Sequence, residues 1–480
     1  MADIYDFVII GSGPSGAVLA YNLCKAGARC LMLEAGKEFT SKTFPSNELN
    51  ANTSLMWNGG MDTTTDASLL FLRGKTLGGG SIINQCLLDR FDDNAFDDWR
   101  DRTGVDFFST EAMTRYYDEV ESKLSLHTME KSDWNRNAEL YVEGFEKCGM
   151  GWAPLRRGQS NCGEGNDCIV CLGGCPRESK QSTLVTYIKM ARELGLEVET
   201  EFNVSQIVHG SNLVSVFGEQ RGNTRQVYGR RCIVAGGSLG TTQMLLKSGF
   251  KDKLPALGDN FTCHPQFMNI ALFDEIVDSH KGAFQSVKSQ DPRFREQGFK
   301  LENVFAGPIA ISMLKPGFGL DHQTFMQKYR NMACIEVAVR DATTGKIDID
   351  KTGRLKIKKK MADADWQRAN AGLQVVEEIF TTVGAREIMK SPIKIGLHLM
   401  GGCTLGKEGK SSVVNEAFQV HDHPNLFIAD SSIFPSAPGI NPSLSIMALA
   451  QKASEHILAE CGVKLEKAKK QQQSVVEVQV

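Results

Sequence analysis

Four cysteines crowd into one short segment, CGEGNDCIVCLGGCP, at Cys162, Cys168, Cys171 and Cys175. Their spacing is C-x5-C-x2-C-x3-C, and Pro176 follows the last cysteine. The last three match part of the ferredoxin-type run C-x2-C-x2-C-x3-C-P, whose thiolates bind an iron–sulfur cluster. The spacing therefore favours an iron–sulfur site. A structural zinc site is an alternative, although the paired C-x-x-C units of a zinc ribbon are absent. Disulfides or unliganded thiols are the third interpretation.

A second chemical signal lies at the N-terminus, where Gly11, Gly13 and Gly16 form G-x-G-x-x-G after the apolar run 7–10. A helix-like segment and a second apolar run, CLMLE, follow, and Glu34 ends that run. Such glycines let the backbone approach a pyrophosphate at a helix N-terminus, and an acidic residue at this distance binds a ribose diol. The pattern predicts a dinucleotide site rather than a glycine-rich structural turn.

NAD and FAD both use this motif, and two further glycine-rich stretches favour FAD. RGKTLGGGS at 73–81 offers a second surface for an elongated dinucleotide. Two segments late in the chain, AGGS at 235–238 and the stretch around Asp430, have the pattern of further glycine-rich strand ends. AGGS follows an apolar run.

The elements that must position these residues follow from periodicity. We expect a βαβ unit over 6–34, helical structure over 109–150, and helices over 183–194, 366–383 and 443–458. Alternation over 196–234 predicts a β-meander, and KIDIDKTGRLKIKKK predicts a hairpin with its turn at 351–353. The charged, Gln-rich segment 463–480 reads as a solvated tail.

Composition limits the class of protein. The chain has 480 residues, enough for two or three domains, and its net charge of −3 gives no electrostatic case for nucleic acid. We see no signal peptide and no apolar run long enough to span a membrane, so we expect a cytoplasmic protein. Its thirteen cysteines are then reduced thiols or metal ligands rather than disulfides. Export or membrane attachment through a partner subunit stays open.

Several blocks together resemble the glucose–methanol–choline family of FAD oxidoreductases. They are GSGPSG with Glu34-Ala35-Gly36, RGKTLGGGSIIN at 73–84, AGGSLGTTQMLLKSG at 235–249, GLHLMGGCTLG at 396–406 and HPNLFIADSSIFPSAPGINPSLSIMALAQ at 423–451. The blocks occur in the family's order and span most of the chain. The resemblance implies an α/β fold, with a Rossmann-like FAD-binding domain and a second, antiparallel-sheet substrate domain.

The resemblance also implies a catalytic pair, His398 and Asn441. Oxidising an alcohol requires removal of the hydroxyl proton while hydride leaves carbon for the flavin. A histidine whose pKa lies near neutrality suits the proton step, and an asparagine can orient the hydroxyl. His264, in CHPQ, is a further candidate near the site that we leave out of the catalytic pair.

The expected FAD contacts follow by position in the same blocks. They are Gly11, Gly13, Pro14, Ser15, Gly16, Glu34, Ala35, Arg73, Thr76, Gly78, Gly79, Ser81, Asn84, Val204, Asp430, Asn441, Pro442, Ser443 and Leu444. We expect non-covalent FAD, because no histidine-bearing segment of the kind that anchors FAD covalently occurs around 75–90.

The domain boundaries are expectations as well. The discontinuous FAD-binding domain comprises 1–40, 72–90, 195–264 and 395–462. The substrate domain and its excursions comprise 41–71, 91–194 and 265–394, including the cysteine segment 162–176.

The cysteine segment with GGCPRESKQST resembles one branch of the family, the sugar dehydrogenases and long-chain alcohol oxidoreductases. The resemblance implies a [3Fe–4S] or [4Fe–4S] cluster that relays electrons. We therefore predict an FAD-dependent dehydrogenase that oxidises an alcohol or sugar hydroxyl and passes electrons to a protein or quinone acceptor. A small partner subunit and a cytochrome are possible partners. The alternatives are an oxygen-using alcohol oxidase with structural cysteines and a non-catalytic electron-transfer flavoprotein subunit.

Overall fold

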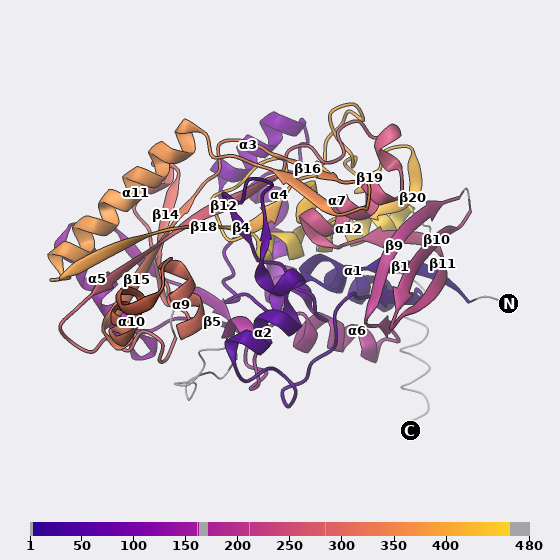
Figure 1. Ribbon diagram of the computed structural model, residues 1–480. Coiled ribbons are helices and arrows are strands. Elements are labelled where there is room, and N and C mark those ends of the chain that lie inside the picture. Colours follow the sequence, from indigo (N-terminus) through magenta and orange to yellow (C-terminus); the bar gives the residue numbers. More distant parts are fainter. Residues whose placement is uncertain (1–2, 161, 163–170, 211, 284, 461–480) are drawn as a thin grey trace, which may run out of the picture.

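The computed structural model describes residues 3–160, 162, 171–210, 212–283 and 285–460 (Figure 1). Cys168 and the expected tail 463–480 lie outside the described residues. The elements form two large sheets, each of eight strands, with helices packed against them. The expected α/β class, a Rossmann-like domain combined with a mainly antiparallel sheet, is confirmed.

The first sheet is built around β1, which pairs in parallel with β2 on one side and β11 on the other. The strand order is β19-β20-β11-β1-β2-β8, and β9 and β10 extend β11 as an antiparallel meander. The strands are β1 (Ile4–Ile10), β2 (Cys30–Leu33), β8 (Glu197–Glu199), β9 (Phe202–His209), β10 (Val214–Gln220), β11 (Asn223–Val234), β19 (Gln419–Val420) and β20 (His423–Ile428).

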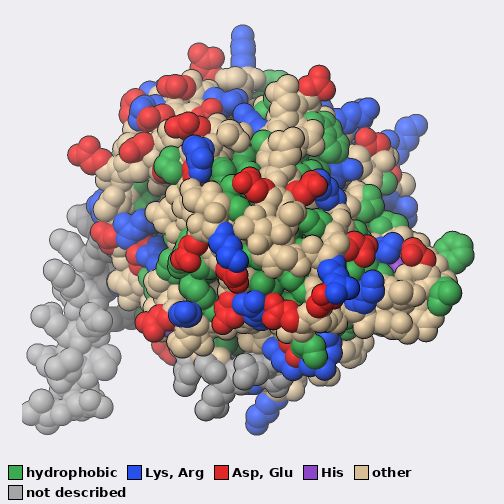
Figure 2. All heavy atoms as spheres, turned by 90° about the vertical axis from the view of Figure 1, so that its left-hand side faces the viewer, with side chains coloured by type: hydrophobic (Ala, Val, Ile, Leu, Met, Phe, Trp, Pro, Cys, Tyr) green, Lys and Arg blue, Asp and Glu red, His purple; other side chains and the backbone are tan. Residues whose placement is uncertain are grey.

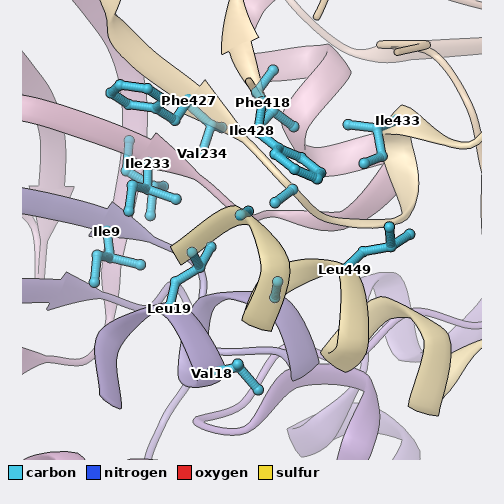
Figure 3. Close-up of a cluster of buried hydrophobic side chains, with 14 of the residues drawn as sticks. Ile9, Val18, Leu19, Ile233, Val234, Phe418, Phe427, Ile428, Ile433 and Leu449 are labelled. Atoms are coloured by element: carbon cyan, nitrogen blue, oxygen red, sulfur yellow. The ribbon is translucent and has the colours of Figure 1, made fainter. Parts of the chain in front are cut away.

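The central strands of this sheet are continuous apolar runs because they are buried in the core of the domain. Helices α1 (Pro14–Lys25) and α12 (Ser443–Glu460) pack together beside β1. Figure 3 shows Ile9, Leu19, Ile233 and Leu449 from four of these elements pointing into one cluster. α1 begins at Pro14, whose fixed φ suits a first helical position.

The second sheet has the order β3-β4-β18-β12-β15-β14-β13-β6 and is antiparallel except where β18 meets β4. Its strands are β3 (Asp62–Thr63), β4 (Leu70–Phe71), β6 (Trp152–Pro154), β12 (Thr262–Leu272), β13 (Val287–Ser289), β14 (Phe299–Asn303), β15 (Met332–Val339) and β18 (Glu387–Met400). Helices α5 (Arg136–Lys147) and α11 (Asp363–Thr382) cover one face of this sheet, at the left of Figure 1. The other face is left for the cavity described below.

The remaining elements connect or flank the two sheets. They are α2 (Glu48–Leu55), α3 (Asp93–Thr103), α4 (Thr110–Glu121), α6 (Lys189–Glu193), α7 (Gly237–Lys247), α8 (Pro292–Gln297), α9 (Pro308–Leu314), α10 (Gly319–Gln327), the ribbon of β5 (Leu126–Thr128) with β7 (Arg156–Gly158), and the ribbon of β16 (Lys346–Ile349) with β17 (Leu355–Lys358).

Most of the expected elements are present. The meander and the β16–β17 hairpin are confirmed. The expected helical stretch 109–150 is wrong in its middle, where β5 separates α4 from α5. Residues 126–128 become a strand because a partner 30 residues away, β7, supplies backbone hydrogen bonds. The helix expected over 183–194 begins with a π turn, Leu184–Ile188, before α6.

The surface carries mixed charge. On the face shown in Figure 2, basic and acidic side chains are interspersed rather than gathered into a patch of one sign. Among the described residues, no helix is both long enough and apolar enough to cross a membrane.

Candidate active site

A cavity of about 1040 Å³ lies between the two sheets. One wall is the turn between β1 and α1, together with the ends of β2 and β11. The opposite wall is the face of the second sheet that α5 and α11 leave uncovered, with side chains from β12, β14, β15 and β18. The carboxyl ends of parallel strands open into it, which is the usual place for a ligand in this architecture.

Each of the three motif positions requires glycine for a different steric reason. Gly11 has φ +104°, and a Cβ there would lie 2.3 Å from the Ala235 carbonyl oxygen. A Cβ on Gly16 would lie 2.1 Å from the Gly11 carbonyl oxygen. Gly13 lines the cavity, and a Cβ there would meet nothing within 4 Å. Gly11 and Gly16 therefore close the turn tightly, whereas Gly13 leaves its space to a ligand.

Glu34 organises this turn. Its carboxylate accepts hydrogen bonds from Ser12 Oγ at 2.6 Å and from the Gly36 amide at 2.8 Å. Ser12 Oγ in turn accepts a hydrogen bond from the Gly78 amide at 2.8 Å, which ties the second glycine cluster to the first. Burial raises the pKa of Glu34 despite these donors. The side chain still lines the cavity, as a ribose-binding residue must.

The structure divides the expected FAD contacts into two groups. Those that line the cavity are Gly11, Gly13, Pro14, Ser15, Glu34, Ala35, Arg73, Gly79, Asn84, Val204, Asp430, Asn441, Pro442 and Ser443. Those that do not line it are Gly16, Thr76, Gly78, Ser81 and Leu444. One member of the second group supports the first through a hydrogen bond: the Gly78 amide donates to Ser12 Oγ, which in turn donates to Glu34.

The cavity wall at the start of α1 fits a dinucleotide. Ser15 lies in the first turn of this helix and lines the cavity, and its buried hydroxyl has no hydrogen-bond partner in the described part of the chain. The positive end of the helix and the free space at Gly13 adjoin it. An unmatched donor at a helix N-terminus suits a pyrophosphate oxygen.

Two histidines meet at the other wall. His398 on β18 lines the cavity, and its Nδ1 lies 2.9 Å from Nδ1 of the fully buried His264 on β12. Behind this pair, the Gly439 amide donates a hydrogen bond of 2.9 Å to Nε2 of His264. His264, which we left out of the catalytic pair, is therefore the direct partner of His398. Asn441 lines the same cavity.

The backbone amide fixes where the protons of this pair reside. Since Gly439 donates to Nε2 of His264, the proton of a neutral His264 is on Nδ1 and is donated to His398. A neutral His398 then carries its own proton on Nε2, the nitrogen not used toward His264. Burial, with a further effect of Lys300, lowers the pKa of His398 to about 3. This value is well below the near-neutral pKa assumed from sequence, because His398 lies in a desolvated wall.

The cysteine segment borders a second, smaller cavity of about 330 Å³. Cys162, Cys171 and Cys175 line it together with Arg157 and Lys180. All three thiols are free. No group of three or more His, Cys, Asp or Glu side chains within the described ranges is arranged to hold a metal ion, and the fourth expected ligand, Cys168, lies outside those ranges.

The surroundings of Cys171 are electropositive and adjoin the main cavity. Burial disfavours its thiolate, but Arg157 and Lys180 outweigh burial and lower the pKa of Cys171. Lys180 donates from Nζ to the carbonyl oxygens of Cys171 at 2.8 Å and Asn84 at 2.9 Å. The next two residues after Cys171, Leu172 and Gly173, line the main cavity. The segment therefore forms part of the wall between the two cavities.

Sequence reasoning missed one group of residues entirely. Gln266, Gln285, Glu302 and Glu336 line the main cavity although they are almost completely buried. The sequence carried one signal for this group. The apolar run ACIEVAV contains Glu336, and a charged residue in a buried strand is unusual.

Comparison with known proteins agrees with the fold. The model for an NAD(P)-binding Rossmann-like domain matches residues 9–63. Two models described as GMC oxidoreductase match residues 52–266 and 342–450, which together cover most of the chain. The chain belongs to the GMC oxidoreductase family. The expected enzyme class, an FAD-dependent oxidoreductase acting on CH–OH groups, is confirmed.

The relatives match nearly the whole of this chain. An uncharacterized GMC-type oxidoreductase of Sinorhizobium fredii is 27% identical, over 95% of this chain and 94% of its own. A long-chain-alcohol oxidase of Arabidopsis thaliana is 27% identical, over 94% of this chain and 67% of its own. The crystal structure of a pyridoxine 4-oxidase, titled as from Mesorbium loti, superposes with a TM-score of 0.75 at 16% identity, covering 94% of this chain and 98% of that one.

Proposed function

We propose that the protein oxidises an alcohol or sugar hydroxyl to the carbonyl with non-covalent FAD, using His398 and Asn441 at the substrate. The observation that carries the proposal is the cavity itself. It joins a dinucleotide turn on one wall to a histidine pair on the other. When bound, FAD supplies the hydride acceptor.

The wall at α1 holds the dinucleotide in this proposal. Glu34 accepts hydrogen bonds from the ribose diol, and Ser15 with the α1 N-terminus binds the pyrophosphate. Asp430 accepts hydrogen bonds from the Gly237 amide at 2.7 Å and Thr241 Oγ1 at 2.6 Å, and so fixes the start of α7 beside the same space.

In this proposal His398 accepts the hydroxyl proton at Nε2, and Asn441 orients the hydroxyl. In the resting pair, Nε2 of His398 carries a proton, so it can accept the hydroxyl proton only in the tautomer that has the His398 proton on Nδ1 and the His264 proton on Nε2, facing the Gly439 amide. That tautomer loses the bond to the Gly439 amide and leaves a buried donor unpaired, which costs about 1–3 kcal/mol. The form competent to act as base is thus a minor tautomer of the pair.

Cys162, Cys168, Cys171 and Cys175 hold an iron–sulfur cluster in this proposal, which would supply one-electron chemistry beside the flavin. Three observations support it: the cysteine spacing, the thiolate-favouring charges of Arg157 and Lys180, and the position of 171–173 between the two cavities. The acceptor is then a protein or a quinone, reached through a partner subunit or a cytochrome.

An oxygen-using alcohol oxidase with structural cysteines is the second candidate. It is favoured by the similarity to the Arabidopsis thaliana long-chain-alcohol oxidase. Hydrogen peroxide formed in step with substrate would support the oxidase and contradict the dehydrogenase. Iron and sulfide analysis of anaerobically purified protein tests the cluster directly. We expect both elements in the native chain and loss of both from Cys175→Ala, with the FAD content retained.

The catalytic assignment is tested by His398→Ala. We expect this variant to bind FAD but to lose anaerobic bleaching of the flavin by alcohols. Intact bleaching would show that His398 does not handle the proton. No bleaching of the native protein across a broad alcohol panel would instead favour the electron-transfer subunit.

A further inference from the structure

One wall of the cavity carries a polar cluster that the proposed oxidation does not use. It consists of Gln266 on β12, Gln285 before β13, Glu302 on β14 and Glu336 on β15, and we call it the Gln266–Glu336 cluster. Each member is at most 5% exposed, and all four line the cavity. Buried polar groups are almost always hydrogen-bonded, so each polar atom here requires a partner.

Every member of the cluster has a hydrogen-bond or ion-pair partner in the described part of the chain, whereas the amide oxygen of Gln266 has none. Gln285 Nε2 donates to Glu302 at 2.6 Å, and Glu302 is also ion-paired with Lys300. Gln266 Nε2 donates to Glu336 Oε1 at 3.4 Å. Gln266 Oε1 has no partner among the described residues. A buried amide oxygen left in this state costs roughly 1–3 kcal/mol unless a ligand supplies a donor.

The charges of the cluster balance. Glu302 and Glu336 face each other directly across β14 and β15, so ionising both is unfavourable. Burial first, and then the charge of Glu302, raise the pKa of Glu336 well above its ordinary value and so favour its neutral form. The remaining carboxylates have cationic partners, since Lys300 pairs with Glu302 and Lys288 lies 2.6 Å from Asp89. The cluster therefore suits a neutral polar group better than an ion.

The cluster lies at a fixed distance from the histidine pair. Gln266 and His264 are two residues apart on β12, so they share a face of the strand and lie roughly 6.5–7 Å apart along it. His264 contacts His398. Apolar side chains, including Met268, Val304 and Phe305, line the same cavity.

We propose that the Gln266–Glu336 cluster binds a second hydroxyl of the substrate, at the far end of an apolar segment from the hydroxyl oxidised at His398. The second hydroxyl donates to Gln266 Oε1, the amide oxygen without a partner in the described part of the chain. The substrate class is thus an α,ω-diol or a polyol with an apolar section, rather than a simple alkanol. This inference rests on the proposed alcohol oxidation.

Matched alcohols test the proposal with the holoenzyme. Anaerobic flavin reduction is followed against the concentration of 1-hexanol, 1,6-hexanediol and 6-amino-1-hexanol. We expect the diol to half-saturate reduction at a concentration at least tenfold lower than 1-hexanol, with the amino alcohol no better than 1-hexanol. Equal half-saturation by diol and alkanol overturns the second-hydroxyl site. Preference for the amino alcohol overturns the assignment to a neutral group. If none of the three bleaches the flavin, the proposed oxidation itself has failed.

A variant pair locates the effect. Gln266→Met removes the amide at nearly constant volume, and we expect it to bring the diol-to-alkanol ratio within about twofold of unity. Gln206→Met, on an exposed position of β9, is the matched control and should retain the tenfold ratio. A diol preference that survives Gln266→Met contradicts the assignment to this cluster. The comparison of substrates in the native protein decides the main point even if the variant does not fold.

Discussion

The two walls of the cavity recognise ligands by different means. The wall at α1 is made mainly of backbone: glycines close the turn, amides and a helix end face the space, and the acidic side chain of Glu34 is held by Ser12 and Gly36. The sheet wall is made of buried side chains that interact across strands, such as His264 with His398 and Gln266 with Glu336. A backbone site depends on the absence of side chains, whereas a side-chain site depends on charge and tautomer. Substitutions in the wall at α1 and in the sheet wall should therefore have different effects on the protein.

The largest effect is expected at the backbone wall, from Gly16→Val. The new Cβ would lie 2.1 Å from the Gly11 carbonyl oxygen, so the turn must open and α1 must move. We expect purified protein without bound flavin and with a sharply lower melting temperature. Gly195→Ala is a matched control, since its φ of +93° is strained but nothing lies within 4 Å of the added carbon. It should cost about 1–2 kcal/mol and keep its FAD. Normal FAD content in Gly16→Val would contradict the steric account.

The next largest effect is expected from Lys359→Met at the sheet wall. Lys359 Nζ lies 2.9 Å from Asp341 Oδ1, and both side chains are fully buried. Asp341 also accepts hydrogen bonds from Thr262 Oγ1 and the Cys263 amide, at the start of the strand that carries His264. Loss of the cation leaves a buried carboxylate unpaired, which typically costs about 3–5 kcal/mol in the free energy of unfolding.

Chemical denaturation measures that loss. Adding Asp341→Asn to Lys359→Met should recover part of the stability, because the uncompensated charge is then gone. A single variant within about 1 kcal/mol of the native protein would mean that this pair does not support the wall.

A smaller effect, confined to catalysis, is expected at His264. His264→Ala removes the hydrogen bond that orients the His398 ring, and we expect flavin reduction to slow by about 100-fold, in kcat more than in KM. His264→Gln should retain part of the rate, because an amide can accept from Gly439 and donate to His398. Equal rates in the alanine and glutamine variants would show that His264 serves packing alone. FAD content should stay normal in both.

The smallest effect concerns pH. The pKa of His398 is about 3 in the folded protein and about 6.5 in an unfolded chain. Between these values the unfolded state binds a proton that the folded state does not, so this group adds stability above pH 6.5 and loses it as pH falls toward 3. Urea titrations at pH 7 and pH 5 should show a smaller pH-dependent loss in His398→Asn than in the native protein. An equal loss in both would place the titration elsewhere.

Most of the backbone wall could be predicted from sequence, because its signal is local. Gly11, Gly13, Gly16 and Glu34 fall within one βαβ unit, and their spacing follows from the turn and the helix that they form. Thr76 and Leu444, predicted from the same kind of motif, do not line the cavity. These lie in the right blocks but pack behind the cavity, because period and spacing do not say which side of a loop faces a ligand.

The contacts within the sheet wall, in contrast, could not be predicted from the sequence. His398 and Asn441 were predicted by resemblance, but the contact of His398 with His264 was not, since the two are 134 residues apart in the chain. The pairing of Glu302 with Glu336, and the raised pKa of Glu336, depend on the register of β14 with β15. Register is set by packing of the whole sheet against α5 and α11, which no local pattern contains.

The sequence by itself determined the family, the dinucleotide turn, the cysteine spacing and the type of most elements, because residues close together in the chain define each of these features. Only the tertiary structure decided which side chains share the cavity, which proton each histidine carries, and which amide oxygen is left for a ligand. The physical reason is that desolvation and hydrogen-bond partners arise when distant strands pair, and they fix the chemistry of groups whose identities alone leave it open.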